Sequence, residues 1–422
     1  MISKKILILL AILFGMSITV QAQIVAETED ETEIEIDEED ELVVKDQSGK
    51  DEIIDFPEAM TYDLDSLLNE YMSKTYLTVE DCNMKNENPS YPQEVYIERL
   101  SRMPTVMEMA HNNIVQQFID RYSSRLRGSV SYMLGACNFY MPIFEEALEA
   151  YQIPLELKYL PIIESALNPR AVSRVGATGL WQFMLATGKQ YNLQVNSLVD
   201  ERRDPIKASY AAAHFLSDLY KVFGDWNLVI AAYNCGPGNV SKAIQRSGGS
   251  KDYWHIYPYL PKETRGYVPA FIAANYIMTY YSQHNICPMG SKLPEQTDTV
   301  MVNKRMHLKQ IASVMDLDIE MLRSLNPMYR CDIIPGSTEP YALRLPQAEI
   351  KRFIELEDSI CGYKASELLT NRAQVEVNDN TPTYRNTKRT TTRKRTTRAR
   401  TTRKAPVRKR TTTRRTTTSK RR

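Results

Sequence analysis

Apolar residues recur at helical spacing through most of the chain between Val95 and Gln283, and this pattern limits the possible folds more than any other feature. Strand-like alternation is nearly absent there, and Pro and Gly stand at the joints between segments. The pattern predicts an α-helical domain over residues 95–290 whose cleft is walled by connecting loops. The longest predicted helices are Met107–Arg121, Val130–Glu149, Ile206–Phe223, Trp226–Tyr233 and Val268–Tyr281.

Glu164 places a carboxylate on the apolar face of another predicted helix, Pro154–Leu167. Leu157, Leu160, Glu164 and Leu167 fall on one stripe of that helix. Apolar neighbours and the negative end of the helix dipole both predict a raised pKa for Glu164. An acid still protonated near neutral pH can act as a general acid. On this helix alone, a buried Glu paired with an Arg is an equally good interpretation.

Short motifs follow Glu164-Ser165 in a fixed order: G-L-W-Q-F-M at 179–184 and A-Y-N-C-G-P-G at 232–238. In this order they resemble the family 1 lytic transglycosylases, whose catalytic domain has a goose-lysozyme-like α fold. D-E-R-R-D-P at 200–205 and P-K-E-T-R-G-Y-V at 261–268 resemble the membrane-bound lytic transglycosylase D branch of that family. The resemblance covers residues 95–285, with its motif core at 150–270.

Cleavage of a glycosidic bond needs an acid that protonates the leaving oxygen, and most glycosidases add a second carboxylate. Asp204 and Glu263 are the obvious second candidates, but they stand in runs that indicate a helix cap and a charged Glu-Thr-Arg pair. The resemblance implies a mechanism with one acid. Glu164 protonates the bond between N-acetylmuramic acid and N-acetylglucosamine, then acts as base on the muramyl C6 hydroxyl and closes a 1,6-anhydro ring. This mechanism uses no metal and no cofactor.

The resemblance also implies supporting roles for residues around Glu164, the expected catalytic acid. Tyr233 is expected to hydrogen-bond Glu164 and orient its proton, whereas a structural role in a turn is an equal alternative for Gln182 and Asn234. Trp181, where the family often has Met, would make the pocket narrower or flatter. The residues expected to contact substrate are Ser165, Gln182, Met184, Tyr233, Asn234, Glu263 and Tyr267.

Two other functions remain open at this point. A lysozyme-like muramidase would cut the same bond with water, and a catalytically silent protein would use the fold only to bind peptidoglycan. An acid on an apolar stripe argues against the silent protein, because an unused buried acid lowers stability.

Residues 297–346 predict a small module of strand, helix, helix and strand. Val300 and Val302 alternate, Asn326-Pro327 ends the second helix, and Tyr341–Leu345 return as a strand. This order resembles a LysM module, a binder of glycan chains, although Thr297 replaces the usual Gly. Glycan binding and packing against the catalytic domain are equal alternatives for the module. Residues 347–375 are expected to be a helical linker.

The two ends of the chain carry opposite charges. Eleven acidic residues lie within Glu27–Glu41, and residues 385–422 hold 18 Lys or Arg without an acid. Such blocks predict disorder, in an acidic segment and linker at 23–94 and in a basic tail at 376–422. The tail could hold anionic envelope polymers, stay inert, pair with the acidic run, or bind nucleic acid, which the export signal makes the weakest choice.

The first 22 residues have the features of a cleaved export signal. Lys4 and Lys5 precede the apolar run Ile6–Phe14, and Val20-Gln21-Ala22 forms a small-residue cleavage site. The chain is therefore expected in the periplasm or cell envelope, with peripheral attachment to the outer membrane left open. Six cysteines permit disulfides but force none, and the cysteine and histidine spacings predict no metal site.

Overall fold

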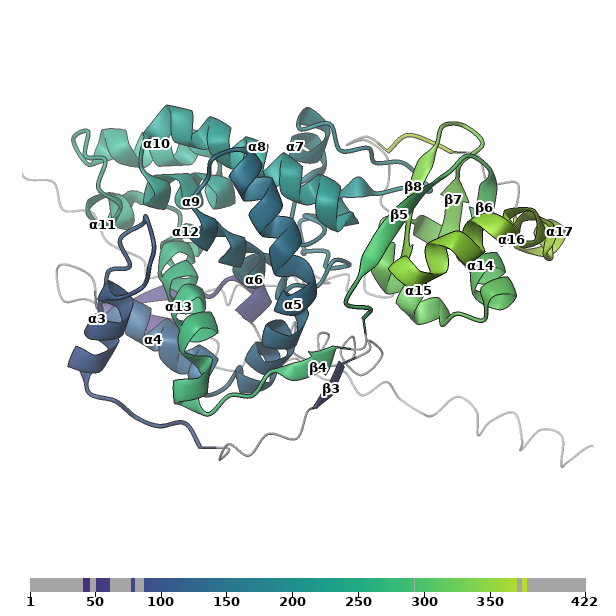
Figure 1. Ribbon diagram of the computed structural model, residues 1–422. Coiled ribbons are helices and arrows are strands. Elements are labelled where there is room, and N and C mark those ends of the chain that lie inside the picture. Colours follow the sequence, from purple (N-terminus) through teal and green to yellow (C-terminus); the bar gives the residue numbers. More distant parts are fainter. Residues whose placement is uncertain are drawn as a thin grey trace, which may run out of the picture. The chain divides into compact units, whose positions relative to one another are not determined.

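The computed structural model describes residues 41–45, 51–60, 77–79, 87–291, 293–369 and 374–377. The predicted signal peptide, the acidic run up to Asp40 and the basic tail beyond Val377 lie outside these residues. Figure 1 labels the elements, which are helical over most of residues 93–284. Among the described residues, no helix combines the length and the apolar character needed to cross a membrane.

The predicted α-helical domain is confirmed, with small shifts at the helix ends. Asn112 caps the helix expected from Met107, because its side chain accepts a hydrogen bond from the Val115 N–H at 2.9 Å, so that helix begins at Asn113. The α-helices of this domain are α3 Gln93–Ser101, α4 Asn113–Ser123, α5 Arg127–Ala150, α6 Leu160–Ser165, α7 Leu185–Gln190, α8 Pro205–Phe223, α9 Trp226–Cys235, α10 Pro237–Arg246, α11 Tyr253–Ile256, α12 Lys262–Arg265 and α13 Tyr267–Tyr280. Short 3₁₀ turns lie at Leu155–Tyr159, Glu201–Arg203, Tyr257–Tyr259 and Tyr281–His284.

The helix α13 forms the centre of the helical domain. Its residues are buried from Tyr267 to Met278, as expected of a helix that is apolar on every face. It packs against α4, α6 and α9, and α8 packs against α5 and α9 (Figure 1). Because α6 carries Glu164, the central helix fixes the position of that carboxyl group.

The structure differs from the prediction in the segment assigned to an acidic linker. Strands β1 (Glu41–Lys45) and β2 (Asp51–Asp55) form an antiparallel hairpin, followed by a 3₁₀ turn at Glu58–Met60. Ile54 and Met60 are buried in the core of the helical domain. Because acidic residues dominate this segment, its composition did not predict that these two apolar side chains are buried.

Residues 297–362 form the predicted small module with an additional pair of strands. Strand β5 (Thr297–Val302) pairs antiparallel with β8 (Tyr341–Pro346), with Val300 opposite Leu343. The remaining elements are β6 Arg305–His307, which pairs with β7 Ile333–Pro335, and the helices α14 Leu308–Met315, α15 Ile319–Leu325, α16 Ile350–Gly362 and α17 Ala365–Leu368. Phe353 and Ile360 of α16 lie in the core of the module, so much of the expected linker belongs to it.

Backbone hydrogen bonds join the module to the helical domain. The Arg330 N–H donates to the Leu198 carbonyl at 2.7 Å, and the Asp200 N–H donates to the Met328 carbonyl at 2.9 Å. The chain then returns to the helical domain, where the Ser197 N–H donates to the Val375 carbonyl at 2.8 Å. Residues 195–200 therefore contact both the module and the segment that follows it.

Strand β3 (Leu77–Val79) pairs with β4 (Met289–Ser291), which precedes the module. Cys287, just before β4, is disulfide-bonded. Free thiols are found at Cys137, Cys235 and Cys361.

Candidate active site

The catalytic candidate lies at the end of a shorter helix than the sequence predicts. A 3₁₀ turn at Leu155–Tyr159 precedes α6, because Pro161 lacks the N–H that a continuous helix needs and is accommodated in the first turn of a new one. Left-handed Ala166, with φ 48°, ends α6. Glu164 therefore keeps its predicted place in a last helical turn.

The surroundings of Glu164 confirm the predicted shift of its pKa. Leu157, Leu160 and Leu167 are fully buried on the same stripe, and Glu164 is half-buried. Burial raises the pKa of the Glu164 carboxyl group well above its ordinary value, because the charged form loses solvation. The group is thus suited to hold a proton near neutral pH.

The hydrogen-bond partner of Glu164 is Tyr267 rather than the expected Tyr233. The Tyr267 hydroxyl, at the start of α13, donates to Oε1 of Glu164. Tyr233 on α9 instead donates to the Trp181 carbonyl at 2.7 Å. Burial, and to a smaller extent the charge of Glu164, raise the pKa of Tyr233.

Ser165 does not have the surface exposure that a substrate contact requires. Its side chain is fully buried, with Oγ 3.0 Å from the Pro161 carbonyl and 2.9 Å from the Leu180 carbonyl. The expectation that Ser165 contacts substrate is therefore corrected: its hydroxyl ties α6 to the turn that contains Gln182.

That turn, residues 178–183, requires glycine at one position. Thr178 and Phe183 exchange backbone hydrogen bonds at 3.1 Å, and Gly179 between them has φ 90°. A Cβ at Gly179 would lie 1.8 Å from the Arg202 carbonyl oxygen, a distance that no side chain tolerates. Gln182 is also left-handed, with φ 47°, and its amide donates to the Gly179 carbonyl at 2.8 Å.

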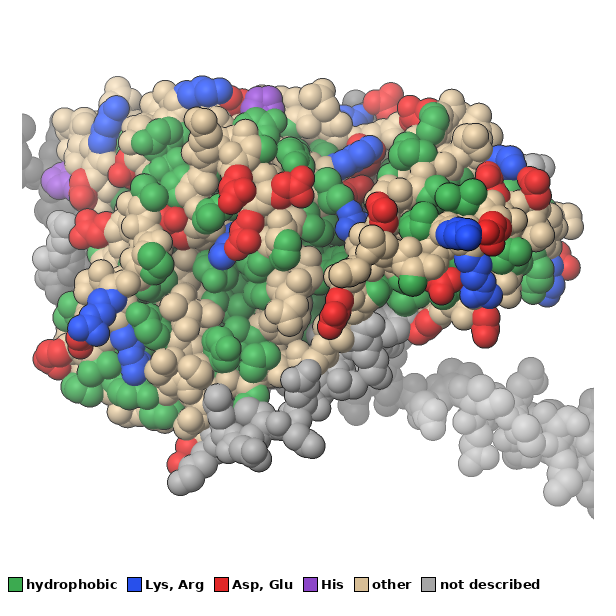
Figure 2. Space-filling model, viewed as in Figure 1, with side chains coloured by type: hydrophobic (Ala, Val, Ile, Leu, Met, Phe, Trp, Pro, Cys, Tyr) green, Lys and Arg blue, Asp and Glu red, His purple; other side chains and the backbone are tan. Residues whose placement is uncertain are grey.

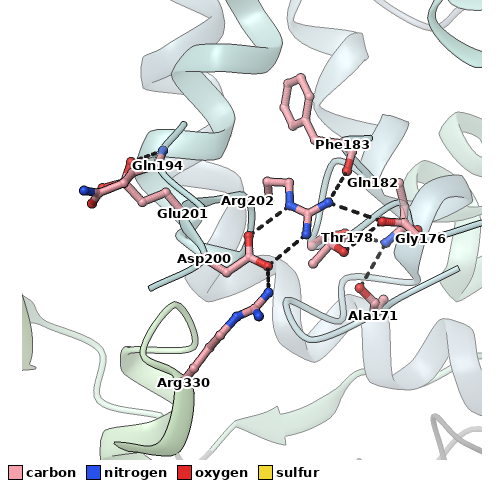
Figure 3. Close-up of polar contacts among 11 residues, drawn as sticks. Ala171, Gly176, Thr178, Gln182, Phe183, Gln194, Asp200, Glu201, Arg202 and Arg330 are labelled. Atoms are coloured by element: carbon pink, nitrogen blue, oxygen red, sulfur yellow. Dashed lines mark hydrogen bonds and ion pairs between the residues drawn. The ribbon is translucent and has the colours of Figure 1, made fainter. Parts of the chain in front are cut away.

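A buried ion pair supports the same turn from outside (Figure 3). Asp200 accepts two hydrogen bonds from Arg202, each at 2.9 Å, and a third from Arg330 of the C-terminal module at 2.6 Å. Arg202 in turn donates to the Phe183 carbonyl at 3.1 Å and the Gly176 carbonyl at 3.3 Å. Although burial opposes ionisation, the two arginines lower the pKa of Asp200.

The other expected contact residues lie at the surface. Met184 is 44% exposed before α7, Asn234 is exposed at the end of α9, and Glu263 is exposed on α12. The Thr264 hydroxyl donates to the Asn234 side-chain oxygen at 2.8 Å, so α9 and α12 meet there. Three of the seven expected contact residues thus offer surface to a ligand, and Gln182 and Tyr233 are half-buried beside them.

Trp181 is a core residue rather than a wall of the pocket. Its ring is fully buried, its N–H donates to Ser209 Oγ at 2.9 Å, and Phe144 packs edge-on against it at 5.2 Å. The expected narrowing of the pocket by Trp181 is therefore wrong. The sequence did not predict the burial of Trp181, because its hydrogen-bond partner Ser209 lies 28 positions away.

The candidates for a second carboxylate do not pair with Glu164. Asp204 caps α8, where it accepts from the Ile206 and Lys207 N–H groups, as the sequence predicts. Within the part of the chain that the structure describes, no hydrogen bond or ion pair links Glu164 to another acid, and no group of His, Cys, Asp and Glu could hold a metal.

Two family models match the chain in the same order as its two parts. The Transglycosylase SLT domain matches residues 141–256, which include Glu164 and the turn at 178–183. This segment is therefore similar to the transglycosylase SLT domain. The Lytic transglycosylase MltD, LysM-like domain matches residues 296–361, which confirms the LysM resemblance and includes α16 except its last residue.

The chain is homologous to membrane-bound lytic murein transglycosylase D of Escherichia coli K12. The two are 32% identical over 240 residues, which cover 54% of this chain and 50% of the relative. It is also 34% identical to the soluble lytic murein transglycosylase of Escherichia coli K12 over 124 residues, 28% of this chain and 19% of the relative. The chain spans about half the length of the first of these relatives. The crystal structure of the 70 kDa soluble lytic transglycosylase from Escherichia coli matches 35% of this chain and 25% of that chain, with 29% identity and a TM-score of 0.30.

Proposed function

We propose that this chain is a lytic transglycosylase that cleaves the bond between N-acetylmuramic acid and N-acetylglucosamine in peptidoglycan. The observation that carries the proposal is the setting of Glu164: an acid whose pKa burial raises well above its ordinary value, in the segment that matches the SLT domain, with a tyrosine hydroxyl on its carboxyl oxygen. The names of the two homologous proteins support the same reaction class.

In this mechanism Glu164 gives its proton to the glycosidic oxygen as the bond to the muramyl C1 breaks. The resulting carboxylate accepts the hydrogen bond of Tyr267, which favours the charged form. The carboxylate then takes the proton of the muramyl C6 hydroxyl while that oxygen bonds to C1. The proton returns to Glu164, and the products are a 1,6-anhydromuramoyl end and a free N-acetylglucosamine end.

The exposed Met184 and Asn234, together with Gln182, Tyr233 and Glu263, are proposed to hold the sugars around that bond. Two hydrogen bonds connect their elements: the bond from Thr264 to Asn234 joins α12 to α9, and the bond from Tyr233 to the Trp181 carbonyl joins α9 to the turn at 178–183. Amide and carboxylate oxygens suit sugar hydroxyl and acetamido groups, since those groups both donate and accept hydrogen bonds.

The products distinguish this proposal from its alternatives. Purified chain should release muropeptides with anhydro ends from isolated cell wall, as measured by mass spectrometry. Reducing muramic acid ends would instead identify a muramidase that uses water. Wall binding without any soluble product would identify a catalytically silent peptidoglycan-binding protein.

The pH profile tests the protonated state of Glu164. Because the acid form must persist, the rate should fall only as pH rises through the raised pKa of Glu164. Tyr267→Phe should move this alkaline limb to still higher pH, because it removes a donor that favours the carboxylate. The rate of anhydro-product formation between pH 4 and 9 checks both. A wild-type limb near pH ~4.3, the ordinary Glu value, would contradict the assignment.

The proposed location is the periplasm or cell envelope. The export signal and the disulfide at Cys287 support it, since disulfides persist in oxidising compartments. Peptidoglycan is the proposed partner of both the SLT domain and the LysM-like module. Side chains of both signs are scattered over the face in Figure 2, and no large basic area stands out there among the described residues.

The basic tail is proposed to hold anionic envelope polymers. Deleting Thr390–Arg422 should weaken binding to whole envelopes, because the tail carries most of the segregated positive charge. The difference should fade as ionic strength exceeds about 0.15 M, where the screening length is about 8 Å. Sedimentation with envelopes over a salt series measures it, and turnover of short soluble glycans is the control, which should not change. Equal binding of both proteins at low salt would make the tail inert.

A further inference from the structure

Segment 51–60, which comprises strand β2 and the 3₁₀ turn at Glu58–Met60, packs against the elements on either side of the bond between Glu164 and Tyr267. The turn packs against α6, which carries Glu164, and β2 packs against α12, which ends two residues before Tyr267 (Figure 1). The match to the SLT domain begins only at residue 141. A part of the chain outside that match therefore connects the two partners of this hydrogen bond.

The contact between β2 and α12 requires glycine at position 266. A Cβ at Gly266 would lie 2.7 Å from the Asp55 carbonyl oxygen and 3.3 Å from the Ile54 side chain, so β2 and α12 could not keep their present spacing. Gly266 has φ −75°, an ordinary helical value, so the close approach of β2 is the reason for glycine here. Because Tyr267 follows directly, β2 touches the residue from which the tyrosine extends.

The contact between the turn and α6 is fixed by a buried side chain and an arginine. Met60 is 1% exposed in the core of the helical domain, and its carbonyl accepts hydrogen bonds from Arg121 of α4 at 3.0 and 3.2 Å. The same guanidinium lies 3.9 Å from the centroid of the Phe56 ring. Segment 51–60 cannot shift along α6 without breaking these contacts.

A third contact of the segment reaches the loop that leads into the turn at 178–183. Oε1 of Glu58 accepts a hydrogen bond from the Arg174 N–H at 3.1 Å, and the Arg174 guanidinium lies 4.0 Å from the same oxygen. The neighbouring Ser173 N–H donates to the Ala177 carbonyl at 2.9 Å, directly before that turn. Segment 51–60 thus contacts three separate parts of the candidate active site.

The position of α6 depends strongly on such contacts. The helix has only six residues and follows a 3₁₀ turn, and a helix this short is not stable by its own backbone hydrogen bonds. It packs against α13 and against the turn at Glu58–Met60. A displacement of about 1 Å at a catalytic group can lower its rate by about 10²-fold, so the packing partners of α6 matter for catalysis.

We propose that segment 51–60 is a positioning element of the active site. It fixes α6 relative to the junction of α12 and α13 and so holds the Tyr267 hydroxyl on the Glu164 carboxyl group. Ile54, Glu58 and Met60 are its positioning residues. The role of Glu164 in this proposal rests on the function proposed above.

Two adjacent isoleucines of β2 provide a matched test. Ile54 is fully buried and faces Gly266, whereas Ile53 is 40% exposed. Ile54→Ala should lower kcat on soluble glycan fragments by up to about 10²-fold with little change in KM, because misplacement affects the chemical step. Ile53→Ala should keep the wild-type kcat. Thermal unfolding verifies that each variant is folded, and Ile54→Val should show a smaller loss of kcat if Ile54→Ala does not fold.

Coupling to Tyr267 separates positioning from general support of the fold. In a Tyr267→Phe background the hydrogen bond is already absent, so adding the Ile54 substitution should cause little further loss of kcat. The same fold-loss in both backgrounds, or a loss at Ile53 equal to that at Ile54, would overturn the proposal.

Titration of the Glu164 carboxyl group gives a readout without activity. Tyr233 of α9 and Tyr267 of α13 are the titratable side chains that interact with Glu164 in the described part of the chain. Because Tyr267 donates to the carboxylate, its displacement in Ile54→Ala should raise the pKa of Glu164, as Tyr267→Phe does, and Ile53→Ala should not. Carbon NMR of labelled glutamate measures this, and Glu164→Gln identifies the signal.

The two readouts distinguish this proposal from the proposed reaction. A raised pKa of Glu164 in the Ile54 variant of a chain that releases no muropeptides would uphold the positioning element and reject the reaction. Anhydro products from a chain whose Ile54 variant has the wild-type kcat and the wild-type pKa of Glu164 would do the reverse.

Discussion

Replacing Glu164 by Gln should lower glycan cleavage by at least about 10²–10⁴-fold, the usual contribution of one general acid. The loss should exceed that range if the same carboxyl group also serves as base, because both proton transfers then fail. Gln keeps the size of the side chain and can still accept the hydrogen bond of Tyr267. Release of soluble muropeptides from purified wall measures the effect, and more than a tenth of the wild-type rate would refute the assignment.

Glu156→Gln is the matched control for this variant. Glu156 is also a buried acid, but its carboxylate accepts the Met107 N–H at 2.8 Å and lies outside the proposed mechanism. Its replacement should leave the pH profile of cleavage unchanged. A readout without activity is also available for Glu164. Its raised pKa means that the folded state binds more protons, so the free energy of unfolding falls as pH rises through that window, and Glu164→Gln removes this slope.

Asp200→Asn should destabilise the fold by about 3–5 kcal/mol, the usual cost of breaking a buried ion pair from one side. Asp200 is fully buried and Arg202 nearly so, and the substitution leaves the guanidinium without its compensating charge. Denaturant unfolding at pH 7 measures the change. Because the pKa of Asp200 is lowered in the folded state, the contribution is present above the ordinary pKa and is lost as pH falls through the lowered value.

The comparison for Asp200 is an ion pair at the surface. Glu98 and Arg102 pair at 2.8 Å with 55% and 73% of their side chains exposed, so Glu98→Gln should change stability by less than about 1 kcal/mol. Asp200→Asn should also slow cleavage, since Arg202 holds the carbonyls of Phe183 and Gly176 at the turn of Gln182. An Asp200 variant as stable as the Glu98 variant would show that the buried pair does not support the fold.

The sequence predicted those features of the fold and the site that depend on a single helix. The stripe of Leu157, Leu160 and Leu167 predicted the apolar surroundings of Glu164, and the structure confirms the resulting rise of its pKa. The apolar pattern of 268–281 likewise predicted α13, which is buried all round. Asp204 was predicted as a cap from its place before Pro205, and it caps α8.

Contacts between distant parts of the chain could not be predicted in the same way. Tyr267 lies 103 positions from Glu164, and Arg330 lies 130 positions from Asp200. Neither pair leaves a periodic signal, because each depends on how whole helices and the module pack. The burial of Ser165 was missed for the same reason, since its partner is the carbonyl of Leu180 in a separate turn.

The placement of Leu198 and Val199 has a consequence for the order in which the protein is completed. Both precede the module in sequence, yet each is only 1% exposed within the module's core. In a chain that emerges N-terminus first, the SLT motifs are all present long before the residues that cover this segment. The ion pair that supports the turn at 178–183 is therefore complete only after Arg330 has been synthesised, because Arg330 binds Asp200. Segment 195–200 gains its backbone contacts with Val375 and Glu376 later still. The helical domain can therefore form its last native contacts only after the chain has been synthesised as far as residue 376.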